Sequence, residues 1–163
     1  MKRWCIIYKK ILIGIDGSEH SYKAILKAAE LQKLSKSEII VFHCVEHQAI
    51  PREFYMSPSY SVPRVYSISD PDLQRIREVY EKNAQAIIDR AEEIFLEFGI
   101  EIEKRLIYEH DPVTYINKTV KEESIDLVII GAKGNHSILE EILIGSVAEK
   151  VLRHTPTDVL IIR

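Results

Sequence analysis

A chain of 163 residues suits one domain, residues 1–163, whose core is large enough to need neither disulfides nor a structural metal. Its formal net charge of −3, with both signs interspersed, offers no basic surface to a nucleic acid, and no apolar run is long enough to cross a membrane, so neither partner is expected. The two cysteines, Cys5 and Cys44, form no C-x-x-C pair, which favours a reducing compartment and a cytoplasmic protein.

Aliphatic runs alternate with helical patterns in the first part of the chain. The first run, 11–15, ends at the turn residues Asp16-Gly17-Ser18, and an amphipathic helix is expected over about 18–34. A second apolar run at 39–45 is continuous rather than alternating, which is typical of a parallel strand covered on both faces. These segments predict a strand, a helix and a second strand.

The middle of the chain begins with a long irregular segment. Residues 46–70 are rich in Pro, Ser and Tyr and follow neither period, which predicts a long loop insertion, either a lid or partner surface or a poorly ordered excursion. Asp70-Pro71 then starts the longest helix, whose apolar face continues to Gly99. The partly alternating, charged segment 100–108 predicts an exposed strand at a sheet edge.

The last part of the chain repeats the alternation. Asp111-Pro112 starts a shorter helix that ends near Glu123, a buried strand follows at 127–131, a helix follows Gly145, and a fifth strand closes the chain at 159–162. Strands that alternate with helices require parallel pairing and right-handed crossovers. The sequence therefore predicts an α/β fold with an open parallel five-stranded sheet and helices on both of its faces.

The order of the strands decides where a ligand would bind. In an open sheet of this kind, ligands lie outside the carboxyl ends of the strands, where the winding reverses. In the order 3-2-1-4-5, Asp16 after the first strand and the turn Gly131-Ala132-Lys133-Gly134 after the fourth share that crevice. The order 2-1-3-4-5 would move the crevice to strands one and three, and the placement of the two turns favours the first order.

The glycine turns have the chemistry of a phosphate site. Gly134 is followed, after ten residues, by Gly145-Ser146 at the start of a helix, where unpaired amides and the helix dipole favour an anion. The plainer interpretation is two loop glycines and a serine that caps the helix. Likewise, Asp16 either caps the first helix, contacts a ligand or does both, and Lys133 either neutralises phosphate or is simply solvated.

Three segments together resemble the universal stress protein family over nearly the whole chain. They are 10–21, 126–131 and 145–152, followed by Pro156 and the terminal strand. The resemblance implies a site for ATP with Mg²⁺ or Mn²⁺, in which Asp16 contacts ribose or adenine, Ile15 lines the base and Cys44 forms a wall of the adenine pocket. It further implies that ribose and phosphates are held by the glycines and the serine of the two turns: Gly131, Gly134, Gly145 and Ser146. The ten-residue spacing is one longer than the ATP-binding pattern of that family.

No catalytic residues are predicted. Neither glycine turn is followed by the Gly-Lys-Ser/Thr triplet of phosphate-transferring loops, and no Ser-His-Asp order or metal-ligand set is discernible. The expected function is that of an ATP-binding regulatory or stress-response protein with slow or no hydrolysis. The alternatives are a nucleotide-free protein-interaction module of the same fold and an enzyme that adenylates or hydrolyses a nucleotide.

A homodimer is expected through the C-terminal strand. Residues 159–162 are all aliphatic, and Arg163 alone adds charge to this edge, so the strand is open to pairing with another strand. The family that the chain resembles commonly dimerises there.

Overall fold

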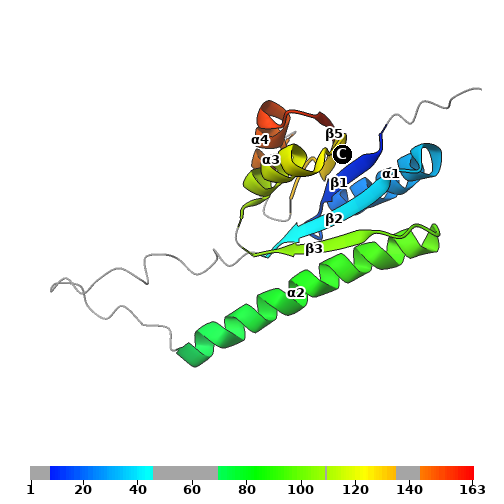
Figure 1. Cartoon of the computed structure of the whole chain (residues 1–163). Coiled ribbons are helices and arrows are strands. Elements are labelled where there is room, and N and C mark those ends of the chain that lie inside the picture. Colours follow the sequence, from blue (N-terminus) through cyan, green and yellow to red (C-terminus); the bar gives the residue numbers. More distant parts are fainter. Residues whose placement is uncertain (1–7, 46–69, 109, 135–143) are drawn as a thin grey trace, which may run out of the picture.

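The computed structural model describes residues 8–45, 70–108, 110–134 and 144–163 (Figure 1). Within them, five parallel strands form one sheet in the order β3-β2-β1-β4-β5. The predicted α/β fold and the strand order 3-2-1-4-5 are therefore confirmed. The predicted loop insertion at 46–70 lies, except for its last residue, outside the described residues.

The elements follow the predicted alternation with small shifts at their ends. The strands are β1 Lys10–Gly14, β2 Glu38–Cys44, β3 Glu103–Ile107, β4 Leu127–Gly131 and β5 Asp158–Ile162. The helices are α1 Glu19–Ser35, α2 Asp70–Glu97, α3 Pro112–Glu123 and α4 Ser146–His154. β3 is shorter than the predicted 100–108, because Ile100 packs into the core after the helix instead of joining the ladder.

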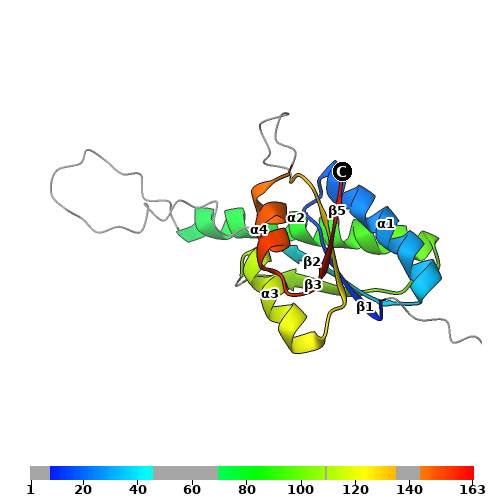
Figure 2. The same cartoon turned by 90° about the horizontal axis from the view of Figure 1, so that it is seen from above.

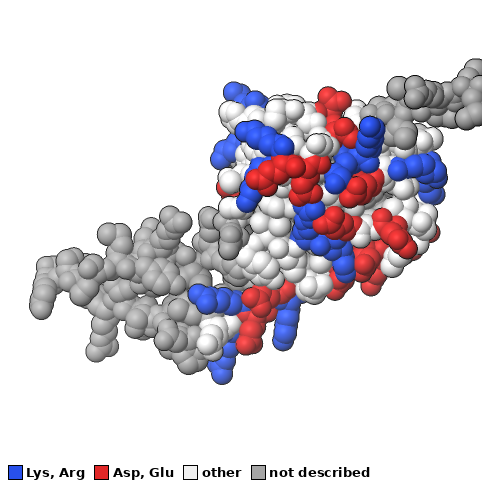
Figure 3. Space-filling model, in the orientation of Figure 1, with Lys and Arg blue, Asp and Glu red and all other residues white. Residues whose placement is uncertain are grey.

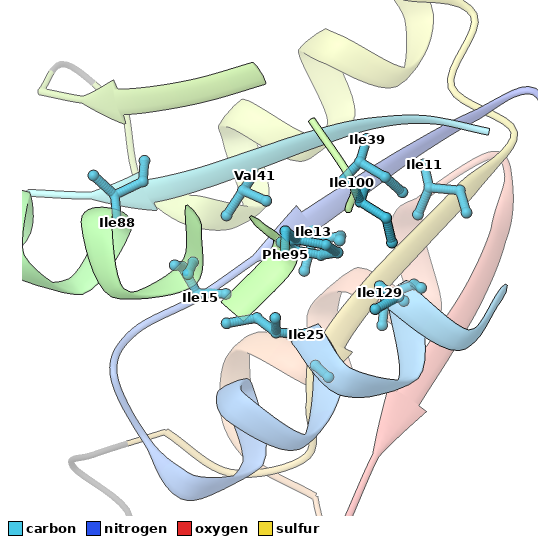
Figure 4. Close-up of a cluster of buried hydrophobic side chains, with 14 of the residues drawn as sticks. Ile11, Ile13, Ile15, Ile25, Ile39, Val41, Ile88, Phe95, Ile100 and Ile129 are labelled. Atoms are coloured by element: carbon cyan, nitrogen blue, oxygen red, sulfur yellow. The ribbon is translucent and has the colours of Figure 1, made fainter. Parts of the chain in front are cut away.

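Among the described elements, α1 and α2 cover one face of the sheet, and α3 and α4 cover the other (Figures 1 and 2). Because neighbouring side chains on a strand point to opposite faces, Ile11 and Ile13 pack against α1 and α2, whereas Leu12 packs against α3 and α4. Figure 4 shows the first of these clusters, with the strand side chains opposite Ile25 of α1 and Phe95 of α2. Both faces of the central strands are therefore buried, as their continuous apolar sequences indicate.

Two apolar stretches are less buried than the sequence predicts. On α2, burial begins at Ala84, whereas Val79 is 66% exposed, because the start of this helix extends past the end of the sheet (Figure 1). On α1, Leu34 lies at the end of the predicted amphipathic helix, and it is 84% exposed in the last turn of the helix. Helical spacing predicts which side of a helix is apolar, but not how far along its length the sheet lies beneath it.

The β3 edge of the sheet carries several ion pairs. On β3, Arg105 forms two bonds of 2.6 and 2.9 Å with the Glu123 carboxylate, and Lys104 pairs with Asp89 and Glu92 of α2. On the face seen in Figure 3, basic and acidic side chains lie among one another instead of in separate patches.

Among the described helices, none combines the length and the apolarity that a bilayer span requires.

Candidate functional site

The carboxyl ends of β1 and β4 lie next to each other. The two strands pair in parallel up to Gly14 and Ile130, so the loops that follow them leave the sheet side by side. A Cβ atom built on Gly134 would lie 2.7 Å from Oδ2 of Asp16. The strand order therefore brings the Asp16 carboxylate and the second glycine of the G-x-x-G turn into contact, as the sequence predicts.

The turn between β1 and α1 holds this carboxylate in place. Oδ1 of Asp16 accepts a hydrogen bond of 3.0 Å from the amide of Ser18, and Gly17 between them has a φ of 78°, which favours glycine. The cap of α1 is Ser18, whose Oγ accepts from the amide of Ser21 at 3.2 Å. The interpretation of Asp16 as the helix cap is therefore wrong, because the capping position falls two residues later.

Ile15 and Cys44, which were expected to line the adenine pocket, lie in different packing clusters. Ile15 is 6% exposed and its side chain packs with the cluster under α1 and α2. Cys44, at the end of β2, is half-buried and packs against the cluster under α3 and α4. Their side chains therefore lie on opposite faces of the sheet.

A buried histidine supports the same turn from the other side. Nδ1 of His43 lies 2.7 Å from the carbonyl oxygen of Ile15, and since a carbonyl only accepts, Nδ1 carries the proton. The amide of Ile15 in turn donates to the carbonyl of Phe42 at 3.0 Å. No role for His43 is predicted from the sequence. Its alternation with Ile39 and Val41 places it on the face of Ile15, and that pattern is visible in the sequence.

The two glycines of the G-x-x-G turn have different surroundings. A Cβ on Gly131 would lie 2.9 Å from the backbone of His20 and Ser21, so the first glycine lets α1 pack closely onto β4. The second, Gly134, is exposed and faces the carboxylate of Asp16 instead. The first glycine therefore serves helix packing, whereas the second belongs to the candidate site.

Gly145 completes the site at the start of α4. Its amide donates to the carbonyl of Ala132 at 2.6 Å, and a Cβ on it would lie 3.9 Å from the amide nitrogen of Gly134. Gly145 is the N-cap of α4 and makes no side-chain cap bond, and Ser146 is the exposed first residue of that helix. The first-turn amides of α4 are thus presented beside Gly134, where the helix dipole favours an anion.

Lys133 contributes its backbone to the site. Its carbonyl oxygen accepts a hydrogen bond of 3.2 Å from Oγ of Ser18, and its side chain is half-buried. The extra residue between Gly134 and Gly145 falls in 135–144, of which the structure describes only Ile144. Among the described residues, no group of three or more His, Cys, Asp or Glu side chains is placed to hold a metal ion.

Comparison with known proteins agrees with this architecture. The model of the universal stress protein family matches residues 7–163. The chain is 31% identical over 158 residues to universal stress protein YxiE of Bacillus subtilis, an alignment that covers 96% of this chain and 100% of YxiE. It also superimposes on universal stress protein UspA of Lactobacillus plantarum with a TM-score of 0.74 and 21% identity, over 96% of this chain and 98% of that one.

Some structural neighbours were solved with nucleotides. A universal stress protein in complex with cAMP has a TM-score of 0.61 and 24% identity, over 96% of this chain and 97% of that one. The Archaeoglobus fulgidus protein in complex with dAMP has a TM-score of 0.61 and 21% identity, over 96% of this chain and 99% of that one. At these identities the likeness establishes the fold alone.

Proposed function

This chain belongs to the universal stress protein family, and on that premise we propose that it binds an adenine nucleotide, namely ATP with Mg²⁺ or Mn²⁺. In this proposal it is a regulatory or stress-response protein of the cytoplasm that hydrolyses ATP slowly or not at all. The choice of an adenine nucleotide is supported by the family neighbours that bind cAMP and dAMP.

The contact between Asp16 and Gly134, beside the start of α4, carries the proposal. A carboxylate accepts hydrogen bonds from sugar hydroxyls and repels phosphate, whereas the amides at a helix start attract phosphate. The carboxylate of Asp16 and the amides at the start of α4 lie side by side, and this arrangement suits a ribose joined to a phosphate chain. We therefore assign the ribose to Asp16, and the phosphates to the backbone of Gly134 and Gly145 and to the hydroxyl of Ser146.

The proposal also covers the ligands of the cation and the rate of ATP hydrolysis. In this proposal the Mg²⁺ or Mn²⁺ binds mainly through phosphate oxygens and water, ligands that Mg²⁺ usually keeps in nucleotide sites. Neither glycine turn is followed by the Gly-Lys-Ser/Thr triplet of phosphate-transferring loops, so slow turnover is expected. Turnover faster than about one per second would contradict a regulatory role.

Calorimetry with ATP, AMP and GTP, with and without Mg²⁺, tests the proposal. Wild-type protein is expected to bind ATP and not GTP, and Asp16→Ala is expected to bind ATP at least about tenfold more weakly, which is the effect of a hydrogen bond to a charged group. Asp126→Ala is the matched control, because this carboxylate also accepts from backbone amides, those of Lys9 and Lys10, at the opposite end of the strands.

The outcome separates the two candidate functions. Equal affinity of Asp16→Ala and wild type would contradict the assignment of the ribose. Failure of wild-type protein to bind any of the three nucleotides would favour the nucleotide-free interaction module, in which the extra residue between Gly134 and Gly145 closes the phosphate site.

The proposed place of Cys44 in the adenine pocket has its own test. In a Cys5→Ser background, ATP is expected to slow alkylation of the Cys44 thiol if the base covers it. An alkylation rate that ATP leaves unchanged, at a concentration that saturates the protein, would remove Cys44 from the site.

We also propose a homodimer through β5. This strand is at one edge of the sheet and carries half-buried aliphatic side chains from Val159 to Ile162, whereas the β3 edge is lined with ion pairs. The carbonyl of Ile162 accepts from the amide of Ala132 next to β4, so by alternation the backbone groups of Val159 and Ile161 point to the open side.

Proline substitution on alternate residues of β5 tests the dimer. Ile161→Pro is expected to give a folded monomer, because it removes an outward amide, whereas Leu160→Pro removes an amide that points toward β4 and is expected to destabilise the fold. Sedimentation at micromolar concentration measures the mass. A wild-type mass equal to one chain would contradict the proposal.

A further inference from the structure

The hydroxyl of Ser18 lies between the two loops of the candidate site. Its Oγ accepts from the amide of Ser21 at 3.2 Å and donates to the carbonyl oxygen of Lys133 at 3.2 Å. The amide of the same residue donates to Oδ1 of Asp16 at 3.0 Å. Ser18 is 8% exposed, so these bonds are shielded from competing water. One buried residue therefore contacts the Asp16 carboxylate, the first turn of α1 and the glycine turn after β4.

We propose that Ser18 is a positioning residue, which fixes the distance between Asp16 and the Gly134 turn before a nucleotide binds. This inference rests on the proposed nucleotide function. The β1–β4 ladder ends at Gly14 and Ile130, so both loops continue beyond the last pair of strand residues. The bond from Ser18 to the Lys133 carbonyl connects the loops beyond that point. A site that is already assembled spares the ligand the cost of ordering it.

Capping alone does not require this arrangement. An N-cap side chain needs only an acceptor for a first-turn amide, and Asp111 does this at α3, where its Oδ1 accepts from the amides of Val113 and Thr114. A serine cap has in addition a hydroxyl proton to donate. In Ser18 that proton is directed to the carbonyl of Lys133, on the other loop of the site.

Four variants separate the cap from the connection between the loops. Ser18→Thr keeps both functions of the hydroxyl, and Ser18→Ala removes both. Ser18→Gly removes the hydroxyl at a position where glycine is itself a tolerated cap, so the cost to the helix is small. Asp111→Ala is the matched control, since it removes a cap of the same kind from α3 and leaves the Ser18 bonds intact.

Calorimetry with ATP and Mg²⁺, below the unfolding temperature of every variant, measures the effect. Ser18→Ala and Ser18→Gly are expected to weaken binding by about 3- to 10-fold, the effect of one hydrogen bond, whereas Ser18→Thr and Asp111→Ala stay within about twofold of wild type. In nucleotide-free protein, the amide resonance of Gly134 is expected to shift in Ser18→Ala and to stay in place in Asp111→Ala.

The outcomes distinguish this inference from the proposed function. If wild type binds ATP and both Ser18→Ala and Ser18→Gly bind it equally well, or Asp111→Ala loses as much affinity, the positioning role is overturned and the nucleotide function stands. If wild type binds no nucleotide, the proposed function fails. In that case an unchanged Gly134 resonance in Ser18→Ala would overturn the positioning role as well, and a shifted one would support it.

Discussion

The two glycines of the G-x-x-G turn are expected to respond differently to the same substitution. A Cβ on Gly131 would lie 2.9 Å from the carbonyl carbon of His20 and from the amide nitrogen of Ser21, both of which belong to the backbone of α1. A Cβ on Gly134 would lie 2.7 Å from one carboxylate oxygen of Asp16. Gly131→Ala must therefore displace a helix, whereas Gly134→Ala need only turn a side chain.

The expected loss of unfolding free energy depends on which group each new methyl group displaces. For Gly131→Ala, overpacking against α1 is expected to cost about 1–3 kcal/mol of unfolding free energy. For Gly134→Ala, turning the Asp16 carboxylate away from the amide of Ser18 costs about 0.5–1.5 kcal/mol. The smaller freedom of alanine in the unfolded chain offsets this by about 0.4–1 kcal/mol. The net loss for Gly134→Ala is therefore below about 1 kcal/mol.

Urea denaturation and calorimetry together provide the assay. Gly131→Ala is expected to lower the urea midpoint, whereas Gly134→Ala is expected to leave it nearly unchanged and to weaken ATP binding about tenfold or more, because the carboxylate proposed to hold the ribose has turned away. A loss of stability in Gly134→Ala as large as that in Gly131→Ala would refute this reasoning, and so would a neutral Gly131→Ala.

Two further predictions concern stability. Glu123→Gln is expected to lower the unfolding free energy by about 1 kcal/mol near pH 7. The hydrogen bonds from Arg105 hold the pKa of Glu123 below its ordinary value of 4.5, so this stabilisation is present above pH 4.5 and is lost as the pH falls through the lower pKa of the folded state. Urea denaturation at pH 7 and pH 2 measures it, and an equal difference between variant and wild type at both would contradict the ion pair as its cause. His43→Phe keeps an aromatic ring but removes the donor to the carbonyl of Ile15, so a loss of about 1–3 kcal/mol is expected, and an unchanged urea midpoint would show that this bond contributes nothing.

Most of the fold was predictable because the pattern of each element agrees with the architecture. The buried strand β4 was predicted at the residues where it lies, since its aliphatic run ends abruptly at Gly131. The order of the strands was favoured over the order 2-1-3-4-5 by the placement of the two turns, which share a crevice only in the order 3-2-1-4-5. The extent of burial was not predictable at Val79 and Leu34, because the length of a helix that the sheet covers depends on tertiary packing.

The candidate site was predictable in its position but not in its internal bonds. The meeting of Asp16 with Gly134 follows from parallel pairing of β1 and β4. The roles of Ser18 and His43 were missed, since each depends on the direction of one polar group toward a carbonyl of another loop. The spacing of a motif does not show toward which acceptor a side chain points. It also does not distinguish the packing role of Gly131 from the place of Gly134 in the site.

A titration of the backbone amide resonances with ATP and Mg²⁺ tests the central claim most directly. The largest changes are expected in the turn at Asp16–Ser18, in Gly131–Gly134 and in Gly145–Ser146, and they are expected to saturate at one nucleotide per chain. Changes confined to the edge strands β3 and β5, or no change at millimolar ATP, would contradict a nucleotide site between the ends of β1 and β4.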